Sequence, residues 1–343
     1  MPHYNYDRLS TQDNSFLLME SANSHMHVSS TLIYEAGPLR TADGGIDIDR
    51  IMQATESYLH LIPRYRQKLH FIPFFDHAVW VDDRHFKLDY HVRHTALPDP
   101  GTDEQLQALS SRVMAQQLDR ARPLWETWII EGLSGDRFAV ITKIHHCMID
   151  GSSGVDLAQI MMSPSPDRTL GEVPTFYPKP APSRGDLVRD EVAYRLNLPI
   201  EAARNITDFA RQSEDVVEEI TKRAKILGAM LGMGLTASDS PLNGPLGPHR
   251  NFNWLETPLD DIKAIRRGLQ CSVNDVVLTI VTGAIRAYMI GRGADPAAKD
   301  FKISAPVSVR REEEKGQLGN RVSSWILQLP IEEEKPLEQL RKI

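Results

Sequence analysis

The stretch that decides the fold is Phe138–Gly151, FAVITKIHHCMIDG. Its first seven residues are mostly apolar or β-branched, which predicts a strand. Two histidines, His145 and His146, follow directly, and Asp150 and Gly151 then turn the chain. This order predicts an imidazole at the mouth of a sheet, where neutral histidine accepts a proton from a hydroxyl group near neutral pH.

Spacing alone leaves three other interpretations of this stretch open. The chain has 12 histidines, so a chance pair with a purely structural role is one of them. Metal ligation by the histidines and Asp150 is the second, but no HExxH or CxxC motif and no third histidine follows at ligand spacing, so we expect no metal ion. Cys147 as a nucleophile with His146 as its base is the third. Adjacent residues at a strand end point in different directions, which favours Cys147 as a small buried residue.

The chain before this stretch alternates helical and extended patterns. Thr11–Asp13 precede an apolar run at helical spacing and predict a short capped helix. Two longer helices are expected over Ile48–Leu59, entered through Asp47 or Asp49, and over Gln105–Leu118. The expected strands are Val28–Tyr34, Ala78–Val81, Glu126–Glu131 and Phe138–Ile144. The last two are joined by Ser134-Gly135-Asp136, which predicts a hairpin.

The rest of the chain changes character. Ser163–Arg184 is rich in proline and predicts an extended linker, and Ile206–Leu231 continues at helical spacing. A second βα pattern is expected from about Phe252, with a helix over Asn274–Ile290 and a strand over Phe301–Val307. The predicted domains are residues 1–170, a linker and long helix over 171–235, and a second domain over 236–343. The closing KPLEQLRKI predicts the start of a helix, so we expect a fragment of a longer protein.

Composition narrows the function classes. There are 39 Lys and Arg against 46 Asp and Glu, so the net charge is −7, which argues against general nucleic-acid binding. Cys147 and Cys271 are too few for a disulfide framework, so a reducing cytosol is expected. The N-terminus has no secretory signal pattern. The most apolar run, Ile226–Ala237, is shorter than the ~20 residues that cross a bilayer.

Motifs along the chain resemble a known family. HHxxxDG, here His145–Gly151, is the signature of the coenzyme A-dependent acyltransferase superfamily, which includes chloramphenicol acetyltransferase and peptide-synthetase condensation domains. Further motifs resemble the bacterial wax ester synthase/diacylglycerol acyltransferase family, in order: Leu9–Glu20, Pro63–Leu69, Leu88–His94, Arg122–Trp125, Asn243–Arg250, Asn274–Leu278 and Pro306–Arg310. This chain departs from the family at His25-Met26-His27-Val28-Ser29, where the family usually has Pro-Met-His-Val-Gly, and the family's second domain normally continues beyond Ile343.

The resemblance implies a fold and a mechanism. The fold is α/β (α+β) and chloramphenicol acetyltransferase-like, with two mixed-sheet subdomains facing across a tunnel and the second apparently truncated. His146 is the general base that deprotonates the acceptor hydroxyl, whose oxygen attacks the thioester directly. Asn274 is the candidate for supporting the oxyanion, with Ser308 a weaker one. Ser272–Asp275 fits a helix N-cap equally well, so a structural role for Asn274 stays open.

The remaining motif residues are assigned structural or pocket roles by the same resemblance. His145, Asp150 and Gly151 orient the loop, and Arg310 is the expected partner of Asp150. The other residues, which pack or line the acyl pocket, are Pro123, Leu124, Trp125 and Ser308.

The implied function is O-acyl transfer in lipid biosynthesis. A long-chain acyl group moves from acyl-CoA to diacylglycerol, giving triacylglycerol, or to a fatty alcohol, giving a wax ester. Acyl-CoA is a substrate and no cofactor is expected. The implied partners are a lipophilic acceptor, a peripheral membrane or lipid-droplet surface, and the chain's own missing C-terminal part, with a cytoplasmic location at the inner membrane face or lipid inclusions. A same-fold enzyme using a carrier-protein thioester or another acceptor, and a non-catalytic fragment, stay open.

Overall fold

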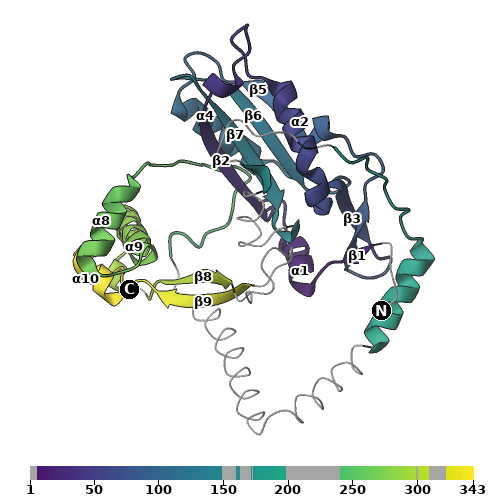
Figure 1. Ribbon diagram of the computed structural model, residues 1–343. Coiled ribbons are helices and arrows are strands. Elements are labelled where there is room, and N and C mark those ends of the chain that lie inside the picture. The colour runs from purple at the N-terminus through teal and green to yellow at the C-terminus, as the bar shows by residue number, and fades with distance from the viewer. Residues whose placement is uncertain are drawn as a thin grey trace. The chain divides into compact units, whose positions relative to one another are not determined.

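The computed structural model describes residues 6–148, 160–162, 171, 173–197, 240–298, 300–308 and 322–343 (Figure 1). The chain divides into two compact units. Unit 1 comprises Met1–Tyr194, Leu246–Asn253 and Ser308–Val322, and unit 2 comprises Arg195–Pro245, Trp254–Val307 and Ser323–Ile343. The histidine pair therefore belongs to unit 1 and Asn274 to unit 2.

The main sheet of unit 1 ends in the histidine pair. Its order is β2 (His27–Glu35), β7 (Arg137–His145), β6 (Trp125–Leu133) and β5 (Val92–Ala96). β7 is antiparallel to both neighbours, whereas β5 runs parallel to β6. The predicted hairpin is confirmed, because Gly135 and Asp136 turn the chain with φ of 79° and 56° between β6 and β7. β5 was not predicted from the sequence.

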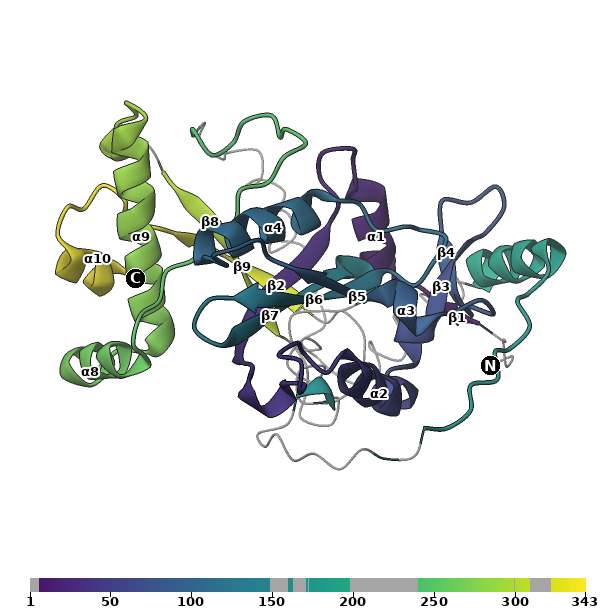
Figure 2. The same ribbon diagram turned by 90° about the horizontal axis from the view of Figure 1, so that it is seen from above.

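Two helices cover opposite faces of this sheet, α2 (Ile48–Tyr58) and α4 (Asp103–Ala115) (Figure 2). The Asp47 side chain caps α2 by accepting from the Arg50 N–H. Thr102 and Gln105 form a capping box on α4, which therefore begins two residues before, and ends three residues before, the predicted bounds. The short helix α1 (Thr11–Met19) is capped by Ser10. These three predicted helices are confirmed.

A smaller sheet accompanies the main one in unit 1. Its order is β1 (Asp7–Arg8), β4 (Ala78–Asp82) and β3 (Gln67–Phe71), with both pairs antiparallel. Short helices complete the unit: η1 (Gly37–Leu39), η2 (Leu59–Leu61), η3 (Pro63–Arg66), α3 (Leu88–His91) and η4 (His146–Met148). Residues 173–183 have no regular structure, as the linker prediction requires, and residues 184–197 are helical.

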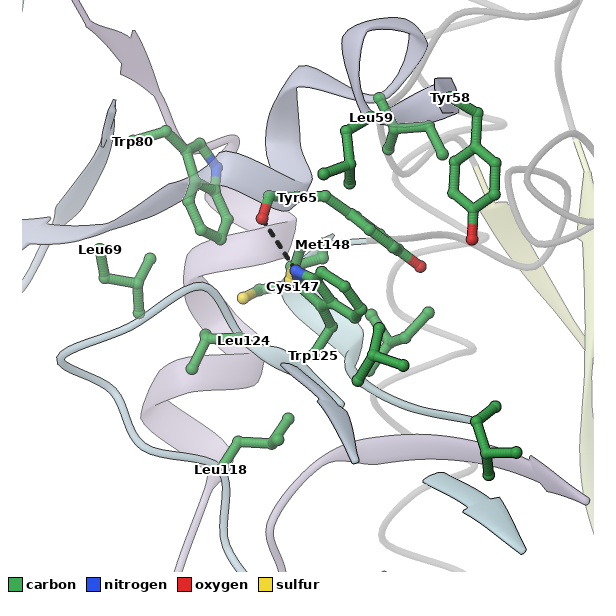
Figure 3. Close-up of a cluster of buried hydrophobic side chains, with 14 of the residues drawn as sticks. Tyr58, Leu59, Tyr65, Leu69, Trp80, Leu118, Leu124, Trp125, Cys147 and Met148 are labelled. Carbon is green, nitrogen blue, oxygen red and sulfur yellow. Dashed lines mark hydrogen bonds between the residues drawn. The ribbon is translucent and has the colours of Figure 1, made fainter. Parts of the chain in front are cut away.

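The main core of unit 1 is built around Trp125, on the α2 face of the sheet. Its indole ring stacks on the Tyr65 ring at 4.3 Å between centroids, and Nε1 donates to the Tyr65 carbonyl at 2.8 Å (Figure 3). The neighbours that share this cluster include Leu124, Cys147 and Met148, all buried. Cys147 and Met148, which follow β7, therefore lie in the same core as Trp125, the first residue of β6.

Unit 2 combines helices with a two-stranded sheet. Its elements are α8 (Leu259–Leu269), α9 (Val273–Gly291), η5 (Pro296–Ala298), β8 (Lys302–Ser308), β9 (Val322–Gln328) and α10 (Pro336–Lys342). The predictions of α9, β8 and α10 are confirmed. The expectation of a strand near Phe252 is wrong, because residues 251–258 are not in a strand and α8 follows them. The sequence pattern of α8 was overlooked, although Asp260 and Asp261 mark its first turn.

The helix α9 is long and apolar enough to cross a membrane by length and composition, with a mean hydropathy of 1.4. The sequence predicted this helix over Asn274–Ile290, but the run expected to be the most apolar was the shorter Ile226–Ala237. Met289 on this helix is fully buried and packs with Leu329 and Ile331, which lie after β9. This contact gives α9 a packed side within unit 2. The predicted long helix over Ile206–Leu231 and its apolar end lie outside the described residues.

Candidate active site

The two histidines leave β7 in different directions. In the strand register His145 is opposite His27, and β7 ends there. His146 begins η4, and its backbone N–H donates to the Met26 carbonyl at 2.8 Å. Its ring stacks on Phe16 of α1, with 4.0 Å between centroids and 21° between planes. The ring of His146 thus lies against α1, whereas that of the strand residue His145 lies near Glu20, the residue that follows α1.

His146 is the partly exposed member of the pair. Its Nδ1 is buried and has no hydrogen-bond partner within the described part of the chain. The position of the ring is therefore set by the backbone contact to Met26 and by the stacked Phe16. An imidazole held in this way is oriented without a described side chain competing for its proton, which suits proton exchange with a substrate.

His145, in contrast, is only 1% exposed. Its Nδ1 accepts the backbone N–H of Cys147 at 3.1 Å, and its Nε2 lies 3.6 Å from Oε2 of Glu20. These contacts tie the end of β7 to the turn that follows it. The loop-orienting role that the resemblance implies for His145 stays a prediction.

Glu20 is a buried carboxylate at the end of the Leu9–Glu20 motif, and the resemblance assigns it no role. It accepts hydrogen bonds from Arg120, through Nε at 2.9 Å and also through Nη2, and from Nε2 of Gln117 at 3.1 Å. Burial by itself raises the pKa of Glu20, but the contacts with His145, Arg120 and Gln117 outweigh it and lower the pKa to about 2. Glu20 is therefore charged at neutral pH.

Two more histidines lie beside this carboxylate. The ring centroids of His25 and His27 are 5.5 Å apart, and those of His27 and His145 are 5.7 Å apart. Both ring nitrogens of His27 are buried without a partner among the described residues. Burial, followed by repulsion from Lys143 and His145, lowers the pKa of His27 to about 3, so this ring is neutral at pH 7. The register of β2 against β7 brings His27 beside His145, which no local sequence pattern predicts.

Two of the three alternative interpretations of this stretch concern Cys147 as a nucleophile and a bound metal ion. Cys147 is 3% exposed, and burial raises the pKa of its thiol above the ordinary value, which keeps the thiol protonated. A protonated buried thiol is a poor nucleophile. Within the described ranges, no group of three His, Cys, Asp or Glu residues is arranged to hold a metal ion.

Asn274 is the second residue of α9, and it is exposed. The N-cap is Ser272, whose hydroxyl accepts from the Asp275 N–H while the Asp275 carboxylate accepts from the Ser272 N–H. This capping box accounts for the Ser272–Asp275 pattern without the Asn274 side chain. The oxyanion role of Asn274 stays a prediction, since this residue belongs to unit 2 and His146 to unit 1.

The structure brings other predicted site residues together only in part. Pro123, Leu124 and Trp125 are buried, the last two in the core of Figure 3. Ser308 is the last residue of β8. Asp150, Gly151 and Arg310 lie outside the described residues, so their roles stay predictions.

Two cavities among the described residues lie away from the histidine pair. One, of about 510 Å³, is lined by residues that include Arg93, Gln117, Arg120 and Glu126. A second, of about 290 Å³, lies between α4 and Phe252. His146 lines neither, so the candidate site is defined by its chemistry.

Comparison with known proteins identifies the class from its fold. The structure is similar to the wax ester synthase/diacylglycerol acyltransferase from Marinobacter aquaeolei VT8, with a TM-score of 0.65, 23% identity, and coverage of 98% of this chain and 70% of that one. It is also similar to the first condensation domain of the calcium-dependent antibiotic synthetase, with a TM-score of 0.58, 16% identity, and coverage of 98% and 72%. The fold is thus that of the chloramphenicol acetyltransferase-like acyltransferases.

The sequence comparisons identify the family within this class. The model of the wax ester synthase/diacylglycerol acyltransferase catalytic domain matches residues 9–277. A protein of Mycobacterium tuberculosis H37Rv named "Probable diacyglycerol O-acyltransferase tgs1" is 32% identical over 340 residues, which are 98% of this chain and 69% of that protein. The corresponding tgs2 protein is 31% identical over 349 residues, 98% of this chain and 72% of that one. The chain belongs to the wax ester synthase/diacylglycerol acyltransferase family and is an acyl-CoA-dependent acyltransferase by that membership.

Proposed function

We propose that this chain transfers a long-chain acyl group from acyl-CoA to the hydroxyl of diacylglycerol or of a fatty alcohol, with His146 as the general base. The observation that carries this proposal is the setting of His146. It directly follows the last strand residue, its backbone N–H donates to the Met26 carbonyl, its ring stacks on Phe16, and it is the partly exposed member of the pair.

The reaction proceeds in one acyl-transfer step. His146 accepts the proton of the acceptor hydroxyl as the oxygen attacks the thioester carbonyl carbon. The tetrahedral intermediate then collapses, the carbon–sulfur bond breaks, and the imidazolium returns the proton to the sulfur of coenzyme A. No acyl-enzyme forms, because the thiol beside His146, that of Cys147, is buried and protonated.

The oxyanion of the intermediate needs a hydrogen-bond donor already in place. We assign this role to the exposed amide of Asn274, because Ser272 and Asp275 form the helix cap without it. Acyl-chain preference follows from apolar burial, since each buried methylene contributes about 0.8 kcal/mol. The acceptor surface is a lipid phase, so we place the enzyme at the inner membrane face or on lipid inclusions.

The test replaces His146 in the whole natural protein and measures ester formation and thiol release from palmitoyl-CoA with diacylglycerol or hexadecanol. His146→Ala lowers the rate about 10²–10⁴-fold, the usual cost of losing a general base. Cys147→Ser serves as the matched control, because it changes the adjacent residue, and it retains activity. Normal turnover by His146→Ala, or a palmitoylated Cys147 detected by mass spectrometry, contradicts the mechanism.

A further inference from the structure

A buried ion pair, that of Glu20 with Arg120, lies beside His145. Glu20 follows the last residue of α1, and its side chain is 3% exposed. Arg120 and Gln117, which follow α4, donate to its two carboxylate oxygens. The carboxylate is therefore held at one position by two residues from a distant part of the chain.

The same carboxylate faces His145. Since Nδ1 of His145 accepts the Cys147 N–H, the neutral ring carries its proton on Nε2. That nitrogen is buried, has no hydrogen-bond partner among the described residues, and lies 3.6 Å from Oε2 of Glu20, so the two interact through charge and not through a hydrogen bond. A negative oxygen opposite an N–H favours this tautomer. The other tautomer places an N–H of the ring against the N–H of Cys147, two donors facing each other.

The contacts form a continuous path to the turn. Arg120 holds Glu20, Glu20 faces Nε2 of His145, and Nδ1 of His145 accepts from the backbone of Cys147. Cys147 is the middle residue of η4, the turn that His146 begins. Resting on the proposed role of His146 as base, we propose that Glu20 is a positioning residue: it fixes the Nε2–H tautomer of His145 and thereby the turn that aims His146 at the substrate.

Other groups near Glu20 do not replace this path. Nδ1 of His25 lies 3.9 Å from Oε1 of Glu20. The oxygen of Glu20 that faces His145 is the other one, Oε2. His27 is adjacent to His145 and is neutral at pH 7. Lys143, on the same face, donates to the carbonyls of Val113 and Gln116 and lies 3.4 Å from Glu126. The tautomer of His145 is thus set by Glu20 on one side and Cys147 on the other.

The first measurement is a double-mutant cycle on the steady-state kinetics of the whole natural protein. Glu20→Ala lowers kcat about 10–100-fold, as expected for a group that orients a functional one, and leaves the KM for palmitoyl-CoA near its original value. Glu20→Gln keeps an oxygen acceptor and recovers most of kcat. His145→Asn offers Oδ1 to the Cys147 N–H in place of Nδ1, but it is too short to reach Glu20.

The cycle then combines Glu20→Ala with His145→Asn. If Glu20 acts through His145, its removal costs nothing further in the His145→Asn background. Equal losses of kcat in both backgrounds overturn the proposal. If Glu20→Ala does not fold, Glu20→Asp runs the same cycle, because it keeps the charge and withdraws the carboxylate from His145.

Two further readouts separate positioning from general stability. Nitrogen-15 NMR of the His145 ring shows Nδ1 unprotonated in the natural protein and a mixture of tautomers in Glu20→Ala; an unchanged spectrum overturns the proposal. The control is Glu191→Ala, which removes another buried carboxylate, paired with Arg8, and lowers the melting temperature without lowering kcat. A kcat loss in Glu20→Ala that Glu191→Ala reproduces at equal melting temperature also overturns it.

His146→Ala, measured alongside, separates the positioning role from the proposed function. If His146→Ala is fully active, the proposed function fails. If it is inactive while the double-mutant cycle is additive, only the positioning role of Glu20 fails.

Discussion

His27 makes the stability of unit 1 depend on pH in a range where most carboxylates do not titrate. Burial lowers the pKa of its ring from 6.5 to about 3, so the unfolded chain binds a proton at mildly acidic pH that the folded chain excludes. The folded state therefore loses stability as the pH falls below 6.5 and continues to lose it until the pH reaches the folded pKa. Replacing His27 by leucine removes this proton uptake and also the two unpaired ring nitrogens.

The size of the effect follows from linkage. For one group with these two pKa values, the free energy of unfolding falls by about 1.3 kcal/mol between pH 7.5 and pH 5.5. This figure is insensitive to the folded pKa as long as that pKa stays well below 5.5. Glu20 does not contribute in this window, because its pKa, lowered from 4.5 to about 2, affects stability only as the pH falls below about 4.5.

The assay is urea unfolding at pH 7.5 and pH 5.5, followed by the fluorescence of Trp80, Trp125 and Trp128, which all lie in unit 1. The loss of stability between the two pH values is expected to be about 1.3 kcal/mol smaller in His27→Leu than in the natural protein. Burial also lowers the pKa values of His70 and His91, but these groups are present in both proteins and cancel in the comparison. Equal losses in the two proteins would refute the assignment of a buried neutral His27.

Two other predictions test the elements that hold the site. Lys143→Met is expected to destabilise unit 1 by about 1–3 kcal/mol, because it leaves two carbonyls at the end of α4 without their donor and the buried Glu126 with Arg93 as its remaining cation, and Glu126→Gln in the same protein recovers part of the loss. Urea unfolding measures both, and a loss below 1 kcal/mol counts against a charged, buried Lys143. In unit 2, Ser272→Ala is expected to cost about 1 kcal/mol through loss of the cap, whereas Asn274→Ala leaves the melting temperature unchanged. Acyl transfer by Asn274→Ala then isolates the oxyanion role: unchanged kcat rules it out.

Local signals were sufficient for the elements that carry the histidine pair. The apolar run before His145, the Ser134–Asp136 turn and the cap at Asp47 are short-range features, and each predicted element is present. β5 was missed because it has only five residues, of which Val92 alone is buried. α8 was missed because only one of its residues, Ile262, is buried. Amphipathic surface elements give weak patterns where few of their residues enter a core.

The residues around His145 could not be predicted for a different reason. Glu20 ends a short helix, Arg120 lies in a loop, and His27 begins a strand, so each has an ordinary local explanation. Their meeting depends on the register of β2 against β7, which pairs His27 with His145. A shift of one residue in that register places His27 on the opposite face of the sheet. No local pattern specifies the register, so the electrostatic surroundings of His145 emerge only when the sheet is assembled.

The histidine pair itself shows how two identical neighbours acquire different chemistry. His145 is the last residue of β7, whereas His146 begins the turn η4, so the two side chains have different surroundings. His145 meets a carboxylate and a backbone N–H, and both its nitrogens are turned to protein groups. His146 stacks on the Phe16 ring and keeps part of its surface exposed. A proton acceptor must exchange its proton with substrate, and of the two rings that of His146 is the partly exposed one, which supports its proposed role as the base and the proposed role of the buried His145 in holding the turn.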